Sequence, residues 1–188
     1  MKRYEVVQLE RKYWDEMAAI YQDGIDNGVT TFQREVPTYE QWIENHIKGF
    51  NIIIKEAEEV IGFASLTKIN NREAYAGVAE VSIYIKNGQR GKGIGTILLN
   101  TLIDMSEKAG FWTLQSTVIV DNIGSKKLHL KCGFREVGYR EKIAQTKYGV
   151  WRDSYLMERR SNIGLQILDS DNVINITETE NEEELLFG

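Results

Sequence analysis

The glycine-rich segment from Arg90 to Thr96 limits what this chain can fold into more than any other feature. Residues 79–85, which precede it, alternate apolar and polar side chains as in a half-buried strand. Residues 94–108, which follow it, carry apolar side chains at helical spacing. Glycines let the backbone approach an anion, and the first turn of a helix offers unpaired N–H groups and a positive dipole end. The order strand, glycine loop, helix therefore predicts an anion site, with phosphate as the best candidate.

The loop differs from the two best-known phosphate loops. No Gly-Lys-Ser/Thr follows four spacer residues as in Walker A, and the glycines at 91, 93 and 95 lack the spacing of a dinucleotide-binding fold. An exposed glycine-rich turn with two solvated basic residues is the alternative. The candidate anion contacts are Arg90, Gly91, Lys92, Gly93, Ile94, Gly95 and Thr96.

Apolar periodicities elsewhere in the chain predict strands and helices in a mixed order. Residues 11–27 and a segment that begins at Thr38 predict helices, and Gln41 completes a capping box with Thr38. The other predicted elements are strands at 4–10, 50–55, 60–67, 112–120, 134–142 and 150–158 and a short helix at about 123–132. This order predicts an α/β fold that is neither a continuous βα alternation nor an all-β array.

We expect one domain at residues 1–160 and an acidic C-terminal tail at 161–188. The tail has seven acidic residues and no Lys or Arg, so the rest of the chain is close to neutral and lacks the strong positive field of a nucleic-acid-binding protein. No run approaches the roughly 18 apolar residues of a membrane span, and the first residues show no signal peptide. With its single Cys132, the chain is expected to be cytoplasmic, without nucleic-acid or membrane partners.

The loop also carries a family resemblance. Arg90, Gly93 and Gly95 resemble the Gln/Arg-x-x-Gly-x-Gly/Ala signature of the GNAT superfamily of N-acetyltransferases. Over about residues 3–159 the chain is similar to the phosphinothricin and methionine sulfone acetyltransferase branch. The segments that carry this likeness are Ile20–Tyr21, Thr31–Phe32, Arg72–Tyr75, Ala79–Ile85, Asn122–Ser125, Leu128–His129, Gly133–Phe134 and Gly149–Asp153.

The resemblance implies a GNAT fold, with a mixed, mostly antiparallel central sheet flanked by helices. It also implies acetyl-CoA as co-substrate, with its pyrophosphate on the glycine loop. In the family, the strand before the loop pairs with the pantetheine arm, and an asparagine after the next strand contacts the same arm. The residues at these positions are Ile83, Tyr84, Ile85, Asn122 and Ser125. Plain core strand and a helix cap at Asn122 are the alternatives for these residues.

Glu80 is the candidate general base. A carboxylate can take the proton of an ammonium group and so free the amine for attack. Glu80 precedes the loop and lies on the strand face opposite Val81 and Ile83, and the same position in the phosphinothricin branch holds the proposed base. A surface glutamate in a salt bridge is the alternative.

His129 stands where many GNAT enzymes have a tyrosine that protonates the leaving thiolate. A protonated imidazole could serve as this acid near neutral pH, and a buried structural histidine is the alternative. The two histidines, His46 and His129, are far apart in sequence and the chain has one cysteine, so we expect no metal site.

Four residues form the candidate substrate site. The resemblance places Arg72 and Tyr75 near the substrate carboxylate or phosphinate, and an arginine fork suits such a group. The branch often has a second basic residue two positions earlier, where this chain has Asn70. Thr31 and Phe32 would form a wall of the site.

Together these features predict N-acetylation of the α-amine of a small amino-acid-like substrate, of the phosphinothricin or methionine sulfone/sulfoximine type, by direct attack in a ternary complex. The resemblance also implies a homodimer. The alternatives are a GNAT enzyme for a polyamine, an aminoglycoside or a protein N-terminus, and a non-catalytic acetyl-CoA-binding sensor.

Overall fold

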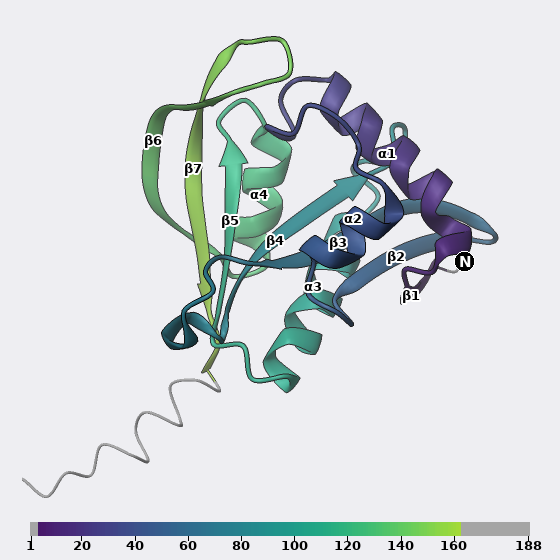
Figure 1. Cartoon of the computed structure of the whole chain (residues 1–188), viewed down its shortest axis with the longest axis horizontal. Coiled ribbons are helices and arrows are strands. Elements are labelled where there is room, and N and C mark those ends of the chain that lie inside the picture. The colour runs from purple at the N-terminus through teal and green to yellow at the C-terminus, as the bar shows by residue number, and fades with distance from the viewer. Residues whose placement is uncertain (1–3, 163–188) are drawn as a thin grey trace, which may run out of the picture.

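The computed structural model describes residues 4–162, which form one seven-stranded sheet with helices on both faces (Figure 1). Apart from Ser161 and Asn162, the predicted acidic tail lies outside the described residues. The strands are β1 (Tyr4–Gln8), β2 (Asn51–Glu56), β3 (Glu59–Lys68), β4 (Val78–Ile85), β5 (Thr113–Ile119), β6 (Arg135–Gln145) and β7 (Trp151–Arg160). The helices are α1 (Trp14–Asp26), α2 (Tyr39–Asn45), α3 (Ile94–Lys108) and α4 (Ile123–Lys131), with short 3-10 turns η1 (Arg11–Tyr13) and η2 (Glu73–Tyr75).

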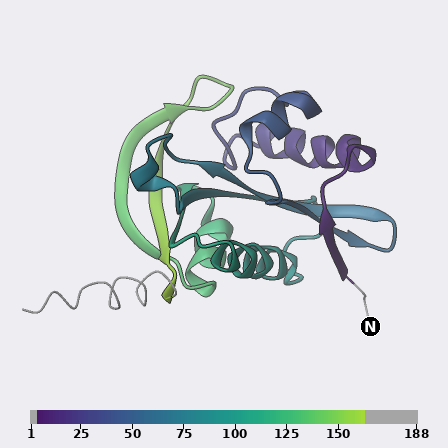
Figure 2. The same ribbon diagram turned by 60° about the horizontal axis from the view of Figure 1, so that its bottom comes forward.

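The strands lie in the order β1-β2-β3-β4-β5-β7-β6, and every neighbouring pair is antiparallel except β4 and β5. The predicted element order and the mixed, mostly antiparallel sheet are therefore confirmed. Figure 2 shows the sheet nearly edge-on, with α1 and α2 on one side and α3 on the other. Among the described residues, no helix is long and apolar enough to cross a membrane.

The alternation in β4 divides the core between the two faces of the sheet. Ala79 and Val81 are buried in the cluster that contains Leu98 and Leu102 of α3. Tyr84, on the other face, belongs to the cluster under α1 and α2, which contains Phe63. The face of β4 with Ala79 and Val81 therefore packs against α3, whereas the opposite face packs under α1 and α2 at Tyr84 and borders a cavity at Glu80 and Ser82.

The parallel pair β4 and β5 separates partway along its length. Its register runs only from Val78 opposite Thr113 to Glu80 opposite Gln115. Beyond Glu80, β4 continues for five residues along β3, whereas β5 pairs with β7. The sheet thus opens into a V between the two strands, and the backbone of β4 on that side has no ladder partner among the described residues.

The ends of two helices follow from their sequences. Thr38 and Gln41 form the predicted capping box, with Gln41 N donating to Thr38 Oγ1 at 3.2 Å and Thr38 N donating to Gln41 Oε1 at 2.9 Å. Gly110 has a φ of +87° just after α3, the left-handed conformation expected of a helix-ending glycine. These local signals explain why the predicted start of α2 and the predicted end of α3 agree with the structure.

The hairpin of β6 and β7 reaches across to the end of α1. Lys147 forms an ion pair with Asp26, and the Tyr148 hydroxyl donates to the Asp26 carbonyl at 2.9 Å. Figure 1 shows the turn of this hairpin beside the connection that follows α1. These contacts fix one edge of the region in which the V opens.

Candidate active site

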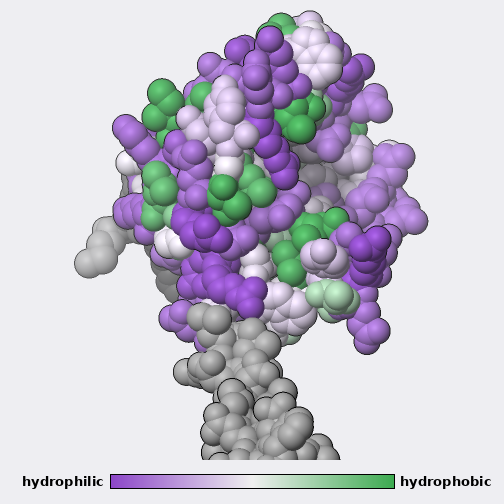
Figure 3. Space-filling view, turned by 90° about the vertical axis from the view of Figure 1, so that its left-hand side faces the viewer, coloured by the Kyte–Doolittle hydropathy of each residue, from purple (hydrophilic) through white to green (hydrophobic). Residues whose placement is uncertain are grey.

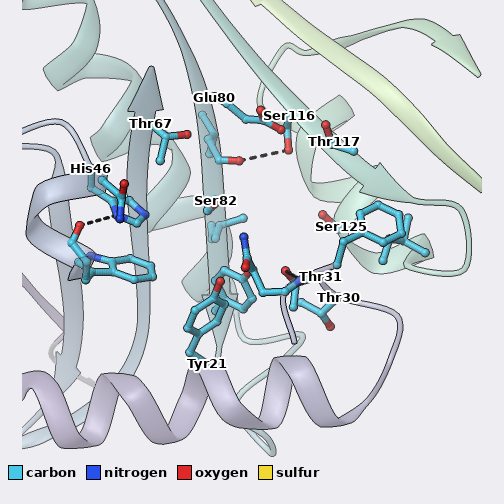
Figure 4. Close-up of a pocket in the computed structure, with 18 of the residues that line it drawn as sticks. Tyr21, Thr30, Thr31, His46, Thr67, Glu80, Ser82, Ser116, Thr117 and Ser125 are labelled. Carbon is cyan, nitrogen blue, oxygen red and sulfur yellow. Dashed lines mark hydrogen bonds between the residues drawn. The ribbon is translucent and has the colours of Figure 1, made fainter. Parts of the chain in front are cut away.

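A cavity of about 620 Å³ lies where β4 and β5 separate. Its walls come from the α1–α2 connection, α2, the end of β3, β4, β5 and α4, and Figure 4 shows their side chains converging on it. Of the residues predicted from the sequence, the cavity brings together Thr31, Phe32, Glu80, Ile83, Tyr84, Asn122, Ser125 and His129.

Glu80 lies on this cavity at the last paired position of the β4–β5 ladder. Its side chain is partly exposed, and Gln115 Nε2 donates to Oε2 across 3.4 Å, a long hydrogen bond. Among the described residues, no Lys or Arg forms a salt bridge with it. The alternative of a surface ion pair therefore has no support in the structure, and the carboxylate is free to accept a proton.

Three hydroxyl-bearing side chains lie beside this carboxylate. Tyr21 of α1, Thr31 of the α1–α2 connection and Tyr84 of β4 all line the cavity, and the two tyrosines are buried. Burial raises the pKa of both tyrosines above the ordinary phenol range, so they stay protonated as hydrogen-bond donors. Thr31 and Phe32 both line the cavity, and their contact with a substrate stays a prediction.

Arg72 and Tyr75 do not line this cavity. Arg72 caps the turn η2 between β3 and β4 and Tyr75 is its last residue; both are exposed, and the Arg72 backbone N–H donates to Asn70 Oδ1 at 2.9 Å. Because η2 leads directly into β4, Arg72 precedes Glu80 by only eight residues. A contact with substrate would have to come from the long arginine side chain reaching in from the rim.

A second cavity, of about 640 Å³, lies between the N-terminal ends of α3 and α4. It shares Thr30, Ile83, Tyr84, Asn122 and Ser125 with the first cavity, so the two are contiguous. From the predicted loop it takes Arg90, Gly91, Gly93, Ile94, Gly95 and Thr96, together with Ile85 of β4. Lys92 is not part of this lining, and its Nζ donates to Oε1 of Gln89, which does line the cavity, at 2.8 Å.

The glycines of the loop have different roles. Gly91 and Gly93 have φ of +78° and +83°, and a Cβ at either position would meet no heavy atom within 4 Å. Their open side leaves room for an anion at the start of α3. A Cβ at Gly95, in contrast, would lie 2.9 Å from Leu128 Cδ2, so this glycine lets α3 pack closely against α4.

At the start of α4, Asn122 is both a helix cap and a residue of the cavity wall. Asn122 Oδ1 accepts from Ser125 N at 3.1 Å, which makes it the N-cap, and both residues also line the two cavities. Lys127 and Lys131 of α4 line the second cavity as well. Their spacing of four residues on one helix face was a signal for a cationic wall that the sequence reasoning missed.

His129 is fully buried at the wall of the first cavity. Its Nδ1 lies 2.8 Å from the Ser125 carbonyl oxygen, which can only accept, so Nδ1 carries the hydrogen. Burial lowers the pKa of His129, and Nε2 has no partner among the described residues. At neutral pH, Nε2 therefore offers a lone pair. The role of general acid, which stays a prediction, would require its protonation first.

One wall of the first cavity went unrecognised in the sequence. Gln41, Trp42, Asn45 and His46 of α2 and its C-terminal end line it. The His46 ring stacks on Trp42 with centroids 3.7 Å apart. The spacing of four between Trp42 and His46 places them on one side of the helix, but the sequence alone gives no reason to connect that side with Glu80.

Comparisons with known proteins agree with this geometry. Residues 8–134 match the acetyltransferase (GNAT) family. The chain is 31% identical over 147 residues to an L-methionine sulfoximine/L-methionine sulfone acetyltransferase of Pseudomonas aeruginosa, which covers 74% of this chain and 84% of that protein. It is 31% identical over 155 residues to a phosphinothricin N-acetyltransferase of Alcaligenes faecalis, covering 79% and 78% of the two chains.

A solved structure is similar in fold as well. It is a phosphinothricin acetyltransferase of Sinorhizobium meliloti in complex with acetyl-CoA, with a TM-score of 0.77 and 27% identity over 85% of this chain and 89% of that one. The family match runs from the end of β1 to the residue before β6, and so includes β2 to β5, the glycine loop and the helices α1 to α4. The chain therefore belongs to the GNAT family of acetyltransferases and is related to the phosphinothricin and methionine sulfoximine acetyltransferases.

Proposed function

We propose that this protein transfers the acetyl group of acetyl-CoA to the α-amine of a small amino-acid-like acceptor. The observation that carries the proposal is the junction of two cavities at the V between β4 and β5. One cavity contains the open glycine loop and basic side chains that suit an anion, and the other contains a carboxylate that has no ion-pair partner within residues 4–162. The names of the relatives supply the acceptor class, with phosphinothricin and methionine sulfone or sulfoximine as the first compounds to test.

The second cavity fits acetyl-CoA. Arg90, Lys127 and Lys131 supply positive charge, and the open glycines at 91 and 93 lie at the start of the 15-residue helix α3. These groups would hold the pyrophosphate. The β5-facing edge of β4 beyond Glu80, which has no ladder partner among the described residues, would bind the pantetheine arm, and its N–H groups would polarise the thioester carbonyl. Acetyl-CoA supplies the activated acyl group.

Glu80 would prepare the acceptor. Its carboxylate takes the proton of the bound ammonium group, directly or through water, and the neutral nitrogen then attacks the thioester carbon. The C–S bond breaks as the C–N bond forms, the nitrogen gives up its second proton, and the departing thiolate takes up a proton in exchange. His129 can supply that proton only in its protonated form, whereas its neutral form accepts a hydrogen bond at Nε2.

Thiol release from acetyl-CoA with a panel of amines tests the proposal. We expect turnover with α-amino acids and their analogues and none with spermidine or an aminoglycoside. Arg72→Ala should raise the KM for carboxylate-bearing acceptors by about tenfold, the value of one charge-assisted hydrogen bond, and leave the KM for acetyl-CoA unchanged. Turnover confined to polyamines would overturn the assignment of the acceptor, whereas equal KM values for the variant and the parent protein would remove Arg72 from the substrate site.

We also propose that the protein is a homodimer that associates through β6 and β7. β6 is an edge strand with exposed apolar side chains, a combination that natural proteins usually cover. Figure 3 shows hydrophobic groups among hydrophilic ones on this side. The exposed apolar residues of the two strands and their turn are Val137, Tyr139, Ile143, Tyr148, Val150 and Trp151.

Light scattering during size-exclusion chromatography checks this. We expect a mass near twice the 21.6 kDa of the chain. Trp151→Lys should shift the mass toward that of the monomer. Trp151 is 55% exposed, so its replacement should not disturb the core. Ile123→Lys, at an exposed apolar position on α4, is the matched control and should keep the larger mass. A monomeric parent protein would contradict the proposal.

A further inference from the structure

The α2 side of the first cavity carries polar and acidic side chains that have no role in the proposed reaction. Glu35, Gln41, Asn45 and His46 line it, on the side away from α4. Figure 4 shows the His46 ring on this wall, with Thr67 between it and Glu80. This wall would meet the part of the acceptor that lies beyond its reacting amine.

His46 presents a hydrogen-bond acceptor to the cavity. Its Nδ1 lies 2.7 Å from the Trp42 carbonyl oxygen and therefore carries the hydrogen. Burial lowers the pKa of His46, so the ring is neutral at neutral pH and Nε2 keeps its lone pair. The stacking on Trp42 holds the ring in this orientation.

The fully buried His129 repeats this arrangement on the opposite wall. Its Nδ1 donates to the Ser125 carbonyl four residues earlier, and its buried Nε2 has no partner among the described residues. Asn45, which also lines the cavity, adds a further acceptor, because its Nδ2 donates to the Gln41 carbonyl at 2.8 Å and its Oδ1 is left to accept. Gln41 is the exception, since its Oε1 is used in the capping box and its Nε2 remains a donor.

The charges of the lining have one sign. Glu35 and Glu80 are carboxylates, and none of the described residues that line this cavity is Lys or Arg. The acidic segment 161–188 contains no Lys or Arg that could add a cation. A phosphinate or sulfone group would bring only acceptor oxygens to this wall, whereas a cationic group would find complementary carboxylate and lone-pair partners.

We propose that the α2 side of the cavity binds a second cationic group of the acceptor, an ammonium or guanidinium at the end of its side chain. The inference rests on the proposed function, in which Glu80 receives the reacting amine. The preferred acceptors are then basic amino acids rather than the sulfone- and phosphinate-bearing compounds named for the relatives. Glu35 is the main charge partner at this end, and His46 Nε2 and Asn45 Oδ1 accept further hydrogen bonds.

L-Arginine, L-citrulline and L-methionine sulfone form the test set, because arginine has one acetylatable amine and citrulline is its neutral isostere. We expect kcat/KM for arginine to exceed that for each of the others by about tenfold, the effect of one charge-assisted contact. Glu35→Gln should remove that preference, and Glu35→Lys should reverse it. Glu44→Gln, which changes an exposed glutamate of α2 outside the lining, should behave like the parent protein.

Calorimetric binding of arginine to the CoA-loaded protein separates this inference from the proposed function. If arginine binds more tightly than citrulline and Glu35→Gln removes this difference, the inference is supported, whether or not any amino acid is acetylated. If no amino acid is acetylated, the proposed function alone is refuted. Turnover on methionine sulfone equal to or above that on arginine would overturn the inference and leave the proposed function standing. An equal effect of Glu35→Gln on all three acceptors would also overturn it.

Discussion

Replacement of Glu80 by glutamine lowers kcat by about 10²–10⁴-fold, the usual contribution of a positioned general base. The amide keeps the size of the side chain and the contact with Gln115, so the fold and the second cavity are retained. The dissociation constant for acetyl-CoA, measured by calorimetry, should therefore stay within about twofold of the parent value. Stopped-assay rates of thiol release give the change in kcat.

The pH dependence of this variant provides a second readout. Without the carboxylate, only the fraction of acceptor that is already neutral can react, so log kcat/KM should rise with pH at a slope near one up to the pKa of the amine. Glu58→Gln, in the exposed turn between β2 and β3, is the control and should follow the parent profile. An unchanged kcat in Glu80→Gln would remove the carboxylate from the mechanism and favour a water-only route or the sensor alternative.

The elements of this fold could be predicted because their signals are local. The capping box at Thr38 and Gln41, the alternation of 79–85 and the ending of α3 at Gly110 each lie within a few residues of the structure they specify. β6 shows the limit of such signals. It extends to Gln145, three residues past the predicted end, with two register shifts and a left-handed Lys142. Such bulges depend on the partner strand, β7, rather than on the sequence of β6 itself.

The site could be predicted only in part, because it is made by segments that are distant in sequence. Glu80 and the glycine loop carry recognisable chemistry, and the structure places them on adjoining cavities. The early end of the β4–β5 ladder, which creates the V, depends on pairing between strands separated by α3 and has no local signal. For the same reason the sequence could not connect His46 with Glu80, nor show that Gly95 serves packing against Leu128.

Gly93→Ala has the second large effect that the structure predicts. Gly93 is the N-cap of α3 with φ of +83°, and a Cβ there would touch no other heavy atom within 4 Å. The cost to the free protein is then backbone strain alone, about 1–2 kcal/mol, or roughly 2–8 °C in Tm for a chain of this length. With acetyl-CoA, the methyl group also occupies the open side on which the pyrophosphate would approach the loop, which should weaken its charge-assisted hydrogen bonds.

Gly49 allows these two effects to be separated. It has φ of +86° and equally open surroundings, but lies between α2 and β2, outside both cavities. Gly49→Ala should therefore lower Tm as much as Gly93→Ala does, while only Gly93→Ala raises the KM for acetyl-CoA, by about 10–100-fold for the loss of one or more contacts with a charged group. Thermal unfolding without ligand and initial rates at saturating acceptor measure the two quantities. Equal KM values for the two variants would mean that the glycine loop does not hold the pyrophosphate, since strain common to both cannot distinguish them.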